Sequence, residues 1–289
     1  MSMKPVIRFP LPEEKRLFYD VYNTGLPNLD EITFQRFSKW WDRSREDGNL
    51  ERLWRVAVLD DRIVGIVINT INEALKWGIV WELAIVPKLR DKGIGTRLVK
   101  ESERLLVKHG TEITHIAIGV KTPNTRAFSL YEKLGYRARF LVLRLKGDVW
   151  KTELTPLLTI REAETTDAGK LSRLVPDAYW TATNVDGWKK RISEGDCRVF
   201  TTRKNSEIVG VVRLSESEKG GRSTEMTFSI KPGFGDAVLD ATTGLVKTKK
   251  IDLWLQDNHQ DIIDYAYQRG LRRIDSEYLM KKPTGKKTR

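Results

Sequence analysis

The stretch Trp81–Val99 reads WELAIVPKLRDKGIGTRLV and decides the expected fold of the chain. It begins as an apolar run that ends at Pro87, which is typical of a buried strand that must stop there. A short basic turn with Gly93 and Gly95 follows, and then an amphipathic helix for which Gly110 is a suitable end. A strand, a glycine turn and a helix N-terminus point several unpaired backbone N–H groups at one place, with the helix dipole behind them. The sequence therefore predicts an anion site, most simply for a phosphate.

Two common nucleotide loops do not fit this stretch. A P-loop requires a lysine and then a serine or threonine directly after its second glycine, and Gly95 is followed by no such pair. The dinucleotide fingerprint requires a third glycine where this chain has Leu98. The remaining pattern, Arg90-x-x-Gly93-x-Gly95, resembles the pyrophosphate loop [QR]-x-x-G-x-[GA] of the GNAT superfamily of acetyl-coenzyme A-dependent N-acetyltransferases.

A second pattern of the same superfamily follows one strand later: Asn124-x-x-Ala127-x-x-x-Tyr131-x-x-x-Gly135-Tyr136. The expected order of elements, β-α-α-β-β-β-α-β-α-β, is also that of the GNAT fold. The resemblance implies an α/β (α+β) fold with a mixed, mostly antiparallel central sheet flanked by helices. Hydrophobic periodicity predicts strands at 5–9, 53–59, 63–69, 79–86, 115–120 and 136–145. The main expected helices are one at 12–22, one that contains 34–41, one that follows the glycine turn and ends at 109, and one at 124–134.

Composition bounds the class of protein. The 289 residues suffice for one large domain or two of ordinary size. No apolar run approaches the ~18 residues of a membrane span, and the N-terminus lacks a signal-peptide hydrophobic region. The single cysteine, Cys197, excludes an internal disulfide, and the three histidines are not spaced as helical metal ligands. We therefore expect a cytoplasmic protein without a metal or a membrane partner.

The net charge of +12 is spread unevenly, with +7 in residues 1–150 and +5 in residues 151–289. Residues 281–289 (KKPTGKKTR) alone carry +5. We expect residues 282–289 to be a disordered, solvated tail rather than a nucleic-acid arm, although the arm stays an alternative. In the first half the excess lies near the two motifs, which suits a polyanionic cofactor as well as nucleic acid.

The chain then repeats itself with a slowly shrinking offset, which indicates a duplication. We therefore expect a catalytic domain at 1–150 (the first half), a degenerate GNAT-like domain at 155–281 (the second half) and a junction at Lys146–Pro156. The matching pairs are Val6-Ile7-Arg8 with Thr159-Ile160-Arg161, Ile63–Val67 with Ile208–Val212, Gly93-Ile94-Gly95 with Gly233-Phe234-Gly235, and Gly135-Tyr136 with Gly270-Leu271.

The second half lacks the chemistry of the first. Five residues, Lys88–Lys92, separate Pro87 from Gly93, whereas Pro232 is followed directly by Gly233, so the phosphate loop is missing. We expect this half to be structural, as a wall of the acceptor pocket or an interface. Aligning Gly270 with Gly135 places Ala266 at Tyr131 and His259 at Asn124, whereas a shift of one residue places Tyr265 and Asn258 there.

The resemblance implies how acetyl-coenzyme A is held. The pyrophosphate lies on backbone N–H groups from Arg90, Asp91, Lys92, Gly93, Ile94, Gly95 and Thr96, and the pantetheine lies along Leu83, Ala84, Ile85 and Val86 as an extra strand. A strand N–H then stabilises the oxyanion. The second motif adds Asn124 and Ala127. Asn124 either bonds the pantetheine or caps the following helix, and both roles can coexist.

Two residues are candidates for catalysis. The resemblance makes Tyr131 the donor of a proton to the leaving thiolate, although a buried tyrosine can also be packing alone. Glu82 is the candidate base for the attacking amine, and a carboxylate at the rim without a role is the alternative. Strand alternation does not show which face Glu82 shares with the acceptor. Five tryptophans could line an acceptor pocket or lie in the core: Trp40, Trp41, Trp54, Trp77 and Trp81.

The expected function is transfer of acetyl from acetyl-coenzyme A to a primary amine by direct attack in a ternary complex. The amine is a small molecule, a lysine side chain or a protein N-terminus. The alternative is a non-catalytic acyl-coenzyme A-binding module that engages a partner. Acidic candidates for a cationic acceptor are Asp20, Asp30, Glu31 and Glu82. The duplicated halves could satisfy internally a pairing that single-domain relatives make as dimers, so the chain is expected to be a monomer or a homodimer.

Overall fold

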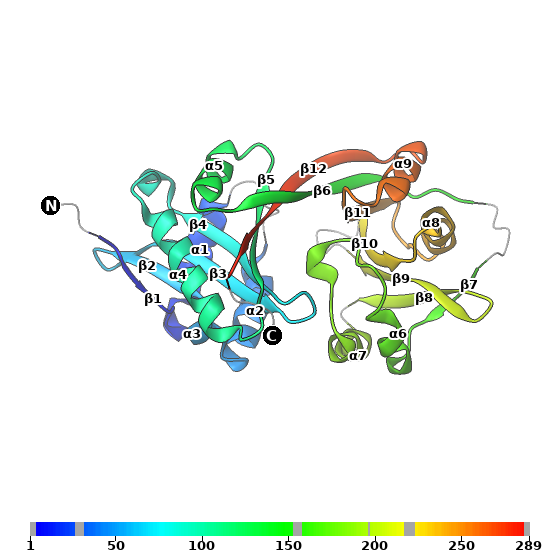
Figure 1. Ribbon diagram of the computed structural model, residues 1–289, viewed down its shortest axis with the longest axis horizontal. Coiled ribbons are helices and arrows are strands. Elements are labelled where there is room, and N and C mark those ends of the chain that lie inside the picture. The colour runs from blue at the N-terminus through cyan, green and yellow to red at the C-terminus, as the bar shows by residue number, and fades with distance from the viewer. Residues whose placement is uncertain (1–3, 27–31, 153–157, 196, 217–222, 286–289) are drawn as a thin grey trace.

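The computed structural model describes residues 4–26, 32–152, 158–195, 197–216 and 223–285. Two lobes are joined by two long neighbouring strands (Figure 1). The strands of these described ranges form one mixed sheet of 12 strands, in the order β1-β2-β3-β4-β5-β12-β6-β11-β10-β9-β8-β7. The α/β prediction is confirmed. No helix in the described part of the chain has the length and apolarity needed to cross a membrane.

The first half contains the predicted elements in the predicted order, with a short extra helix before β2. Its strands are β1 (Val6–Arg8), β2 (Arg55–Leu59), β3 (Arg62–Asn72), β4 (Trp77–Ile85), β5 (His115–Lys121) and β6 (Arg137–Asp148). Its helices are α1 (Lys15–Gly25), α2 (Phe34–Glu46), α3 (Asn49–Arg52), α4 (Ile94–His109) and α5 (Thr125–Lys133), with short 3-10 turns at Pro12–Glu14 and Pro87–Leu89.

The second half follows the same plan. Its strands are β7 (Thr159–Glu162), β8 (Arg198–Lys204), β9 (Glu207–Glu216), β10 (Ser223–Ile230), β11 (Lys250–Gln256) and β12 (Arg272–Pro283). Its helices are α6 (Ala168–Leu171), α7 (Val185–Glu194), α8 (Gly235–Thr243) and α9 (Gln260–Gln268), with 3-10 turns at Thr165–Asp167 and Tyr179–Thr181. Counterparts of all the regular strands of the first half are present.

An aromatic core fixes the helices of the first half against its sheet. Helix α2 begins after Thr33, whose hydroxyl accepts a hydrogen bond from the Arg36 N–H, and it buries Phe37 and Trp41 completely. Phe18 of α1 packs against both, with its ring centroid 6.0 Å from that of Phe37 and 5.3 Å from that of Trp41. The three-and-four spacing of aromatic residues in the sequence thus produces the buried face of α2, as predicted.

The two halves exchange their last strands. Strand β12 of the second half lies between β5 and β6, and β6 of the first half lies between β12 and β11 (Figure 1). β12 pairs antiparallel with β5 from Glu277 to Pro283 and with β6 along nearly its whole length. Because each half completes the sheet of the other, the pairing between the duplicated halves is satisfied within one chain.

This exchange corrects two expected boundaries. Lys146, Gly147 and Asp148 were expected in the junction, but they are the end of β6 and pair with β11. Lys281, Lys282 and Pro283 pair with β5, so the basic segment from 282 is not a disordered tail over its first residues. Only its last four residues, 286–289, lie outside the described part.

The backbone also decides between the two alignments of the repeat. β11, α9 and β12 each begin and end 135 residues after β5, α5 and β6. His259 precedes α9 at φ −98° and ψ 52°, close to the φ −87° and ψ 62° of Asn124 before α5. His259 is therefore the counterpart of Asn124, and Ala266 is the counterpart of Tyr131. The second half has lost the phenol.

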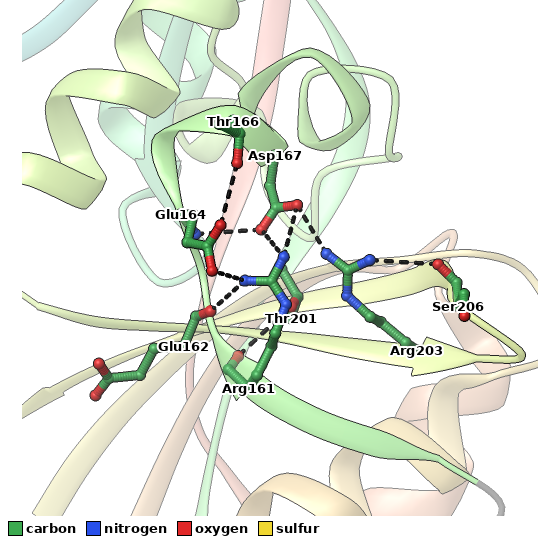
Figure 2. A network of polar contacts seen from close by, with 8 residues as sticks. All are labelled: Arg161, Glu162, Glu164, Thr166, Asp167, Thr201, Arg203 and Ser206. Carbon is green, nitrogen blue, oxygen red and sulfur yellow. Dashed lines mark hydrogen bonds and ion pairs between the residues drawn. The ribbon is translucent and has the colours of Figure 1, made fainter.

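Contacts at the start of each half repeat as well. In the first half, both terminal nitrogens of the Arg8 guanidinium donate to the Glu14 carboxylate, which also accepts a hydrogen bond from the Leu11 N–H. In the second half, Arg161 donates to Asp167, 153 residues after Glu14, and Asp167 likewise accepts from the Glu164 N–H (Figure 2). Such a shared device, in which an acid ties the first turn to the first strand, supports the duplication independently of the glycine motifs.

Asp167 gives the first prediction. Its side chain is 7% exposed and also accepts from Arg203, at 2.7 Å. We expect Asp167→Ala to lower the free energy of unfolding by about 2–4 kcal/mol, because two partly buried guanidinium groups lose their carboxylate. The control is Glu162→Gln, since the exposed Glu162 side chain points away from the network (Figure 2). Urea unfolding followed by fluorescence measures both, and equal stabilities would contradict the assignment.

Candidate active site

A cleft opens in the first half where two neighbouring strands separate. β4 and β5 pair in parallel only from Trp77 to Val80, and β5 then continues beside β12. A bulge in the β3–β4 register lies at Trp81, since Ile68 pairs with Glu82 but Asn69 pairs with Val80. The far side of β4 from Trp81 to Ile85 is thereby left without a neighbouring strand. The resulting cavity has a volume of about 960 Å³.

The predicted phosphate loop borders this cavity. Asp91 and Gly93 adopt left-handed backbone conformations, with φ of 64° and 76°, and α4 begins directly afterwards without a side-chain cap. A Cβ atom added to Gly93 would meet no atom within 4 Å, so the space above the loop is open. The first N–H groups of a helix have no acceptor within it. The loop therefore presents free N–H donors, and the positive end of the helix dipole, to the cleft.

The charged residues of the loop have different surroundings. Arg90 is anchored, since its guanidinium donates to the carbonyl oxygens of Gly25 and Ile85, so it holds the loop against α1 and β4. Asp91 forms an ion pair with Arg126 of α5, across the mouth of the cleft. Lys92 is exposed and does not line the cavity. Arg126 is thus a cation at the phosphate loop that the sequence motifs did not single out.

The second motif forms the opposite wall. Asn124 caps α5, because its Oδ1 accepts a hydrogen bond from the Ala127 N–H at 3.1 Å, and both residues line the cleft. Tyr131 also lines the cleft and is 5% exposed. Burial and the nearby Glu82 carboxyl raise the Tyr131 pKa above its ordinary value. The phenol is therefore protonated at neutral pH, as a proton donor must be.

Glu82 lies deep in the same cleft. Ala84, two residues after Glu82 on the same face of β4, packs against Gly25 of α1. A Cβ atom added to Gly25 would lie 2.7 Å from the Ala84 Cβ atom. Glu82 and Ala84 therefore face α1, and the Tyr22 hydroxyl of α1 lies 3.5 Å from Glu82 Oε1. Burial is the main cause that raises the Glu82 pKa to about 8, followed by the Glu277 carboxylate, and Lys121 and the Tyr22 hydroxyl oppose the shift. A carboxylate with this pKa can exchange a proton near neutral pH.

The remaining strand and loop residues divide by side-chain position. Leu83, Ile85, Arg90, Asp91, Gly93, Gly95 and Thr96 line the cavity, as do Asn124 and Ala127. The side chains of Ala84 and Ile94 are 1% and 3% exposed and belong to the core, and Val86 packs beside it. Ala84 and Ile94 can therefore serve a ligand only through the backbone, as the pantetheine and pyrophosphate predictions require, whereas the N–H and the carbonyl oxygen of Val86 are already hydrogen-bonded to Val64 and Leu89.

A second cavity of about 940 Å³ adjoins the first. Both are lined by Trp81, Glu82, Lys121, Trp180, Glu225 and Trp254, which we call the neck. Of the five tryptophans considered above, Trp40, Trp54 and Trp81 line this second cavity, Trp41 is in the core, and Trp77 packs near Tyr179. Of the acidic candidates, Glu82 is in the neck, Asp20 pairs with Arg16 on the surface, and Asp30 and Glu31 lie outside the described residues.

Three of the six neck residues belong to the second half of the chain. Trp180 precedes α7, Glu225 is on β10 and Trp254 is on β11, and their places follow from the strand exchange. Glu277 of β12 also lines the first cavity. Local sequence patterns could not identify these residues, because long-range strand pairing is what brings them to the cleft. The expectation that the second half forms a pocket wall agrees with this placement.

The equivalent cleft of the second half is closed. Only four residues separate β10 from α8, whereas eight separate β4 from α4. Ile262, the counterpart of Ala127, is buried and would lie 2.6 Å from a Cβ added to Gly235, the counterpart of Gly95. At Gly95 itself the nearest atom would be Leu130 Cδ2, at 3.7 Å. Packing of α9 onto α8 thus fills the space that is open in the first half.

Comparison with known proteins agrees with this geometry. Residues 16–136 match the sequence profile of the Acetyltransferase (GNAT) family. These residues form a GNAT-family domain. They contain the phosphate loop, Asn124, Ala127 and Tyr131, so the matched segment is the half of the chain with the open cleft. No curated protein matches the chain in sequence.

Solved structures extend the GNAT fold to the whole chain. The GCN5-related N-acetyltransferase from Sphaerobacter thermophilus is 13% identical with a TM-score of 0.72, covering 97% of this chain and 96% of that one. A putative acetyltransferase from Pyrococcus horikoshii is 12% identical with a TM-score of 0.69, covering 100% and 92%. A tandem GNAT protein from the clavulanic acid biosynthesis pathway is 13% identical with a TM-score of 0.67, covering 98% and 100%. The chain therefore has a tandem GNAT fold, as predicted.

Proposed function

We propose that the chain transfers an acetyl group from acetyl-coenzyme A to a primary amine, with the reaction confined to the first half. The observation that supports this most strongly is the single cleft that runs from the free N–H groups at the start of α4, past the open side of β4, to Tyr131 and Glu82. Pyrophosphate would bind to the loop, with Arg126 nearby, and pantetheine along Leu83–Ile85.

Glu82 and Tyr131 each carry out one of the two proton transfers. The amine nitrogen attacks the thioester carbonyl carbon, and a β4 N–H stabilises the oxyanion. Glu82 takes the proton that the nitrogen must lose, and the C–S bond breaks as the tetrahedral intermediate collapses. Tyr131 donates its phenolic proton to the departing thiolate of coenzyme A. The acceptor reaches Glu82 through the second cavity, so both substrates are bound when the amine attacks.

The rival function is a non-catalytic acyl-coenzyme A-binding module. It shares the loop and the cleft but needs neither Glu82 nor an acceptor cavity. An assay that follows release of the coenzyme A thiol with a panel of amines, polyamines, amino acids and peptides separates the two. We expect thiol release that depends on the amine. Normal binding of acetyl-coenzyme A with no release for any amine would support the module instead.

Ala127 provides a steric test of the cofactor site. We expect Ala127→Ile to weaken acetyl-coenzyme A binding about 10- to 100-fold, because an isoleucine at the equivalent position fills the cleft of the second half. The control is Ala127→Ser, which adds one small atom and should change the dissociation constant less than about threefold. Calorimetric titration of both variants measures this. Unchanged binding by the isoleucine variant would place the cofactor elsewhere.

A further inference from the structure

The neck contains an acidic side chain that the proposed chemistry does not use. Glu225 lies on β10, its side chain is exposed to both cavities, and it has no hydrogen bond or ion pair with another described residue. Across the sheet it is in register with Asp252 of β11. Burial and the neighbouring Asp252 raise the pKa of Glu225, so a cationic ligand beside this carboxyl would favour its ionised form.

Two of the cations near Glu225 are held by other carboxylates. Lys121 pairs with Asp275 at 2.5 Å and with Glu277 at 3.5 Å. Arg144 donates to both carboxylate oxygens of Asp252, at 2.8 to 3.1 Å, and Asp252 is only 4% exposed. Lys121 and Arg144 therefore bond directly to other carboxylates and not to Glu225, whose raised pKa is opposed at longer range by Arg144, Arg213 and Arg36.

Arg36 is a further cation on the wall of the second cavity, and it makes no ion pair with Glu225. Its side chain is exposed on α2. Its presence raises a competing possibility, that an acceptor brings a carboxylate to Arg36 rather than a cation to Glu225. The experiment below therefore includes amines of both kinds.

The walls around Glu225 are aromatic. Trp180 and Trp254 contact each other edge to face, with ring centroids 5.7 Å apart, and Trp81 completes the neck. Trp254 already contacts the ammonium of Lys121, 4.8 Å from its ring centroid, and the guanidinium of Arg144, at 5.1 Å. Indole rings attract cations through their faces. The walls therefore suit an alkylammonium chain better than a second anion.

An independent polar atom in the second cavity also lacks a partner. Asn69 is 2% exposed and lines this cavity. Its Nδ2 donates to the Leu53 carbonyl oxygen at 2.7 Å, which fixes the orientation of the amide, and its Oδ1 has no hydrogen bond. A buried amide oxygen without a donor is costly, so it indicates a ligand that brings N–H groups.

We propose that the acceptor is a diamine or polyamine, whose reacting amino group lies at Glu82 while a second cationic nitrogen is bound by Glu225 between Trp180 and Trp254. This inference rests on the proposed acetyl transfer and adds its substrate class. The duplicated half then has a defined role: it has lost its own cofactor cleft and supplies the specificity of the other.

The test compares the full chain and its Glu225→Gln variant on α,ω-diamines of three to six carbons, the matched monoamines, and the ω-amino acids of the same lengths. We expect kcat/KM of the best diamine to exceed that of its monoamine by about 10- to 100-fold, the range of a hydrogen-bonded charge pair. In Glu225→Gln we expect this ratio to fall to within about threefold of unity, mainly through KM. Asp257→Asn, a change of an exposed side chain outside both cavities, should leave the ratio unchanged.

Each outcome decides the proposal. A diamine preference that depends on Glu225 supports it. Equal use of monoamines and diamines, a preference that survives Glu225→Gln, or a preference for ω-amino acids would overturn the substrate class while leaving acetyl transfer intact. No thiol release with any amine would overturn both proposals together. Acetyl-coenzyme A titration of Glu225→Gln shows that the variant is folded.

Discussion

Tyr131→Phe should lower kcat for acetyl transfer by about 10²-fold, the scale of a lost general acid. The phenylalanine keeps the ring that packs in the wall of the cleft and removes only the proton that the leaving thiolate needs. Because the hydroxyl acts on the departing sulfur, the affinity for acetyl-coenzyme A should change little. Steady-state kinetics with a saturating amine, together with calorimetric titration of the cofactor, measures both quantities.

Tyr136→Phe is the matched control. Tyr136 is also completely buried, its ring centroid is 6.1 Å from that of Tyr131, and it does not line the cleft. We expect its kcat to stay within about threefold of the parent value, since a group without contact to the reacting atoms contributes no proton transfer. Full activity of Tyr131→Phe would show that Tyr131 only packs.

Glu82→Gln should lower kcat/KM by about 10²- to 10³-fold and remove a pH dependence. In the parent chain the base must be ionised, so kcat/KM should rise with pH and level off above a midpoint near 8, the raised pKa of Glu82. The groups around this carboxyl are Tyr22 of α1, Lys121 of β5 and Glu277 of β12. If the glutamine variant kept the same midpoint, another group would be the base.

The same pKa gives a stability prediction that does not depend on activity. The folded chain holds the Glu82 proton up to a pH near 8, whereas the unfolded chain releases it near the ordinary value of 4.5. The stability that this group contributes is therefore fully present below pH 4.5 and is lost as the pH rises to 8. Glu82→Gln should then gain stability relative to the parent over this range. Urea unfolding at several pH values measures the difference, and a difference that stays constant with pH would contradict the shift.

The local features of the first half could be predicted from the sequence. Pro87, Gly93 and Gly95 gave the strand end, the turn and the helix start, because each acts through backbone geometry within a few residues. The aromatic spacing of α2 gave its buried face. The offset of 153 residues between Arg8 and Arg161 indicated the duplication, which the shared acid contacts of Glu14 and Asp167 then confirmed.

The arrangement of the two halves could not be predicted in this way. β6 and β12 have equal lengths and equivalent places in the two halves, so nothing local shows that each crosses into the other half. The placement of Glu225 and Trp254 in the neck depends on that crossing. For the same reason Lys146 was assigned to a junction and Lys282 to a tail, whereas both are in strands.

The closed cleft of the second half could be predicted only in part from its sequence. The sequence showed that Lys88–Lys92 have no counterpart, but the alignment around His259 stayed open by one residue. The backbone dihedral angles before α9 decide between the two alignments and identify Ile262 as the counterpart of Ala127. The second half therefore differs from the first in two ways, a missing loop and a filled cleft.

The stoichiometry of acetyl-coenzyme A binding, measured by calorimetric titration of the full chain, tests the central claim most directly. An open cleft in the first half and a filled one in the second predict one molecule bound per chain, with the weaker binding already expected for Ala127→Ile. Two molecules per chain would show that the second half also binds the cofactor. No binding at millimolar cofactor would contradict the acetyltransferase assignment itself.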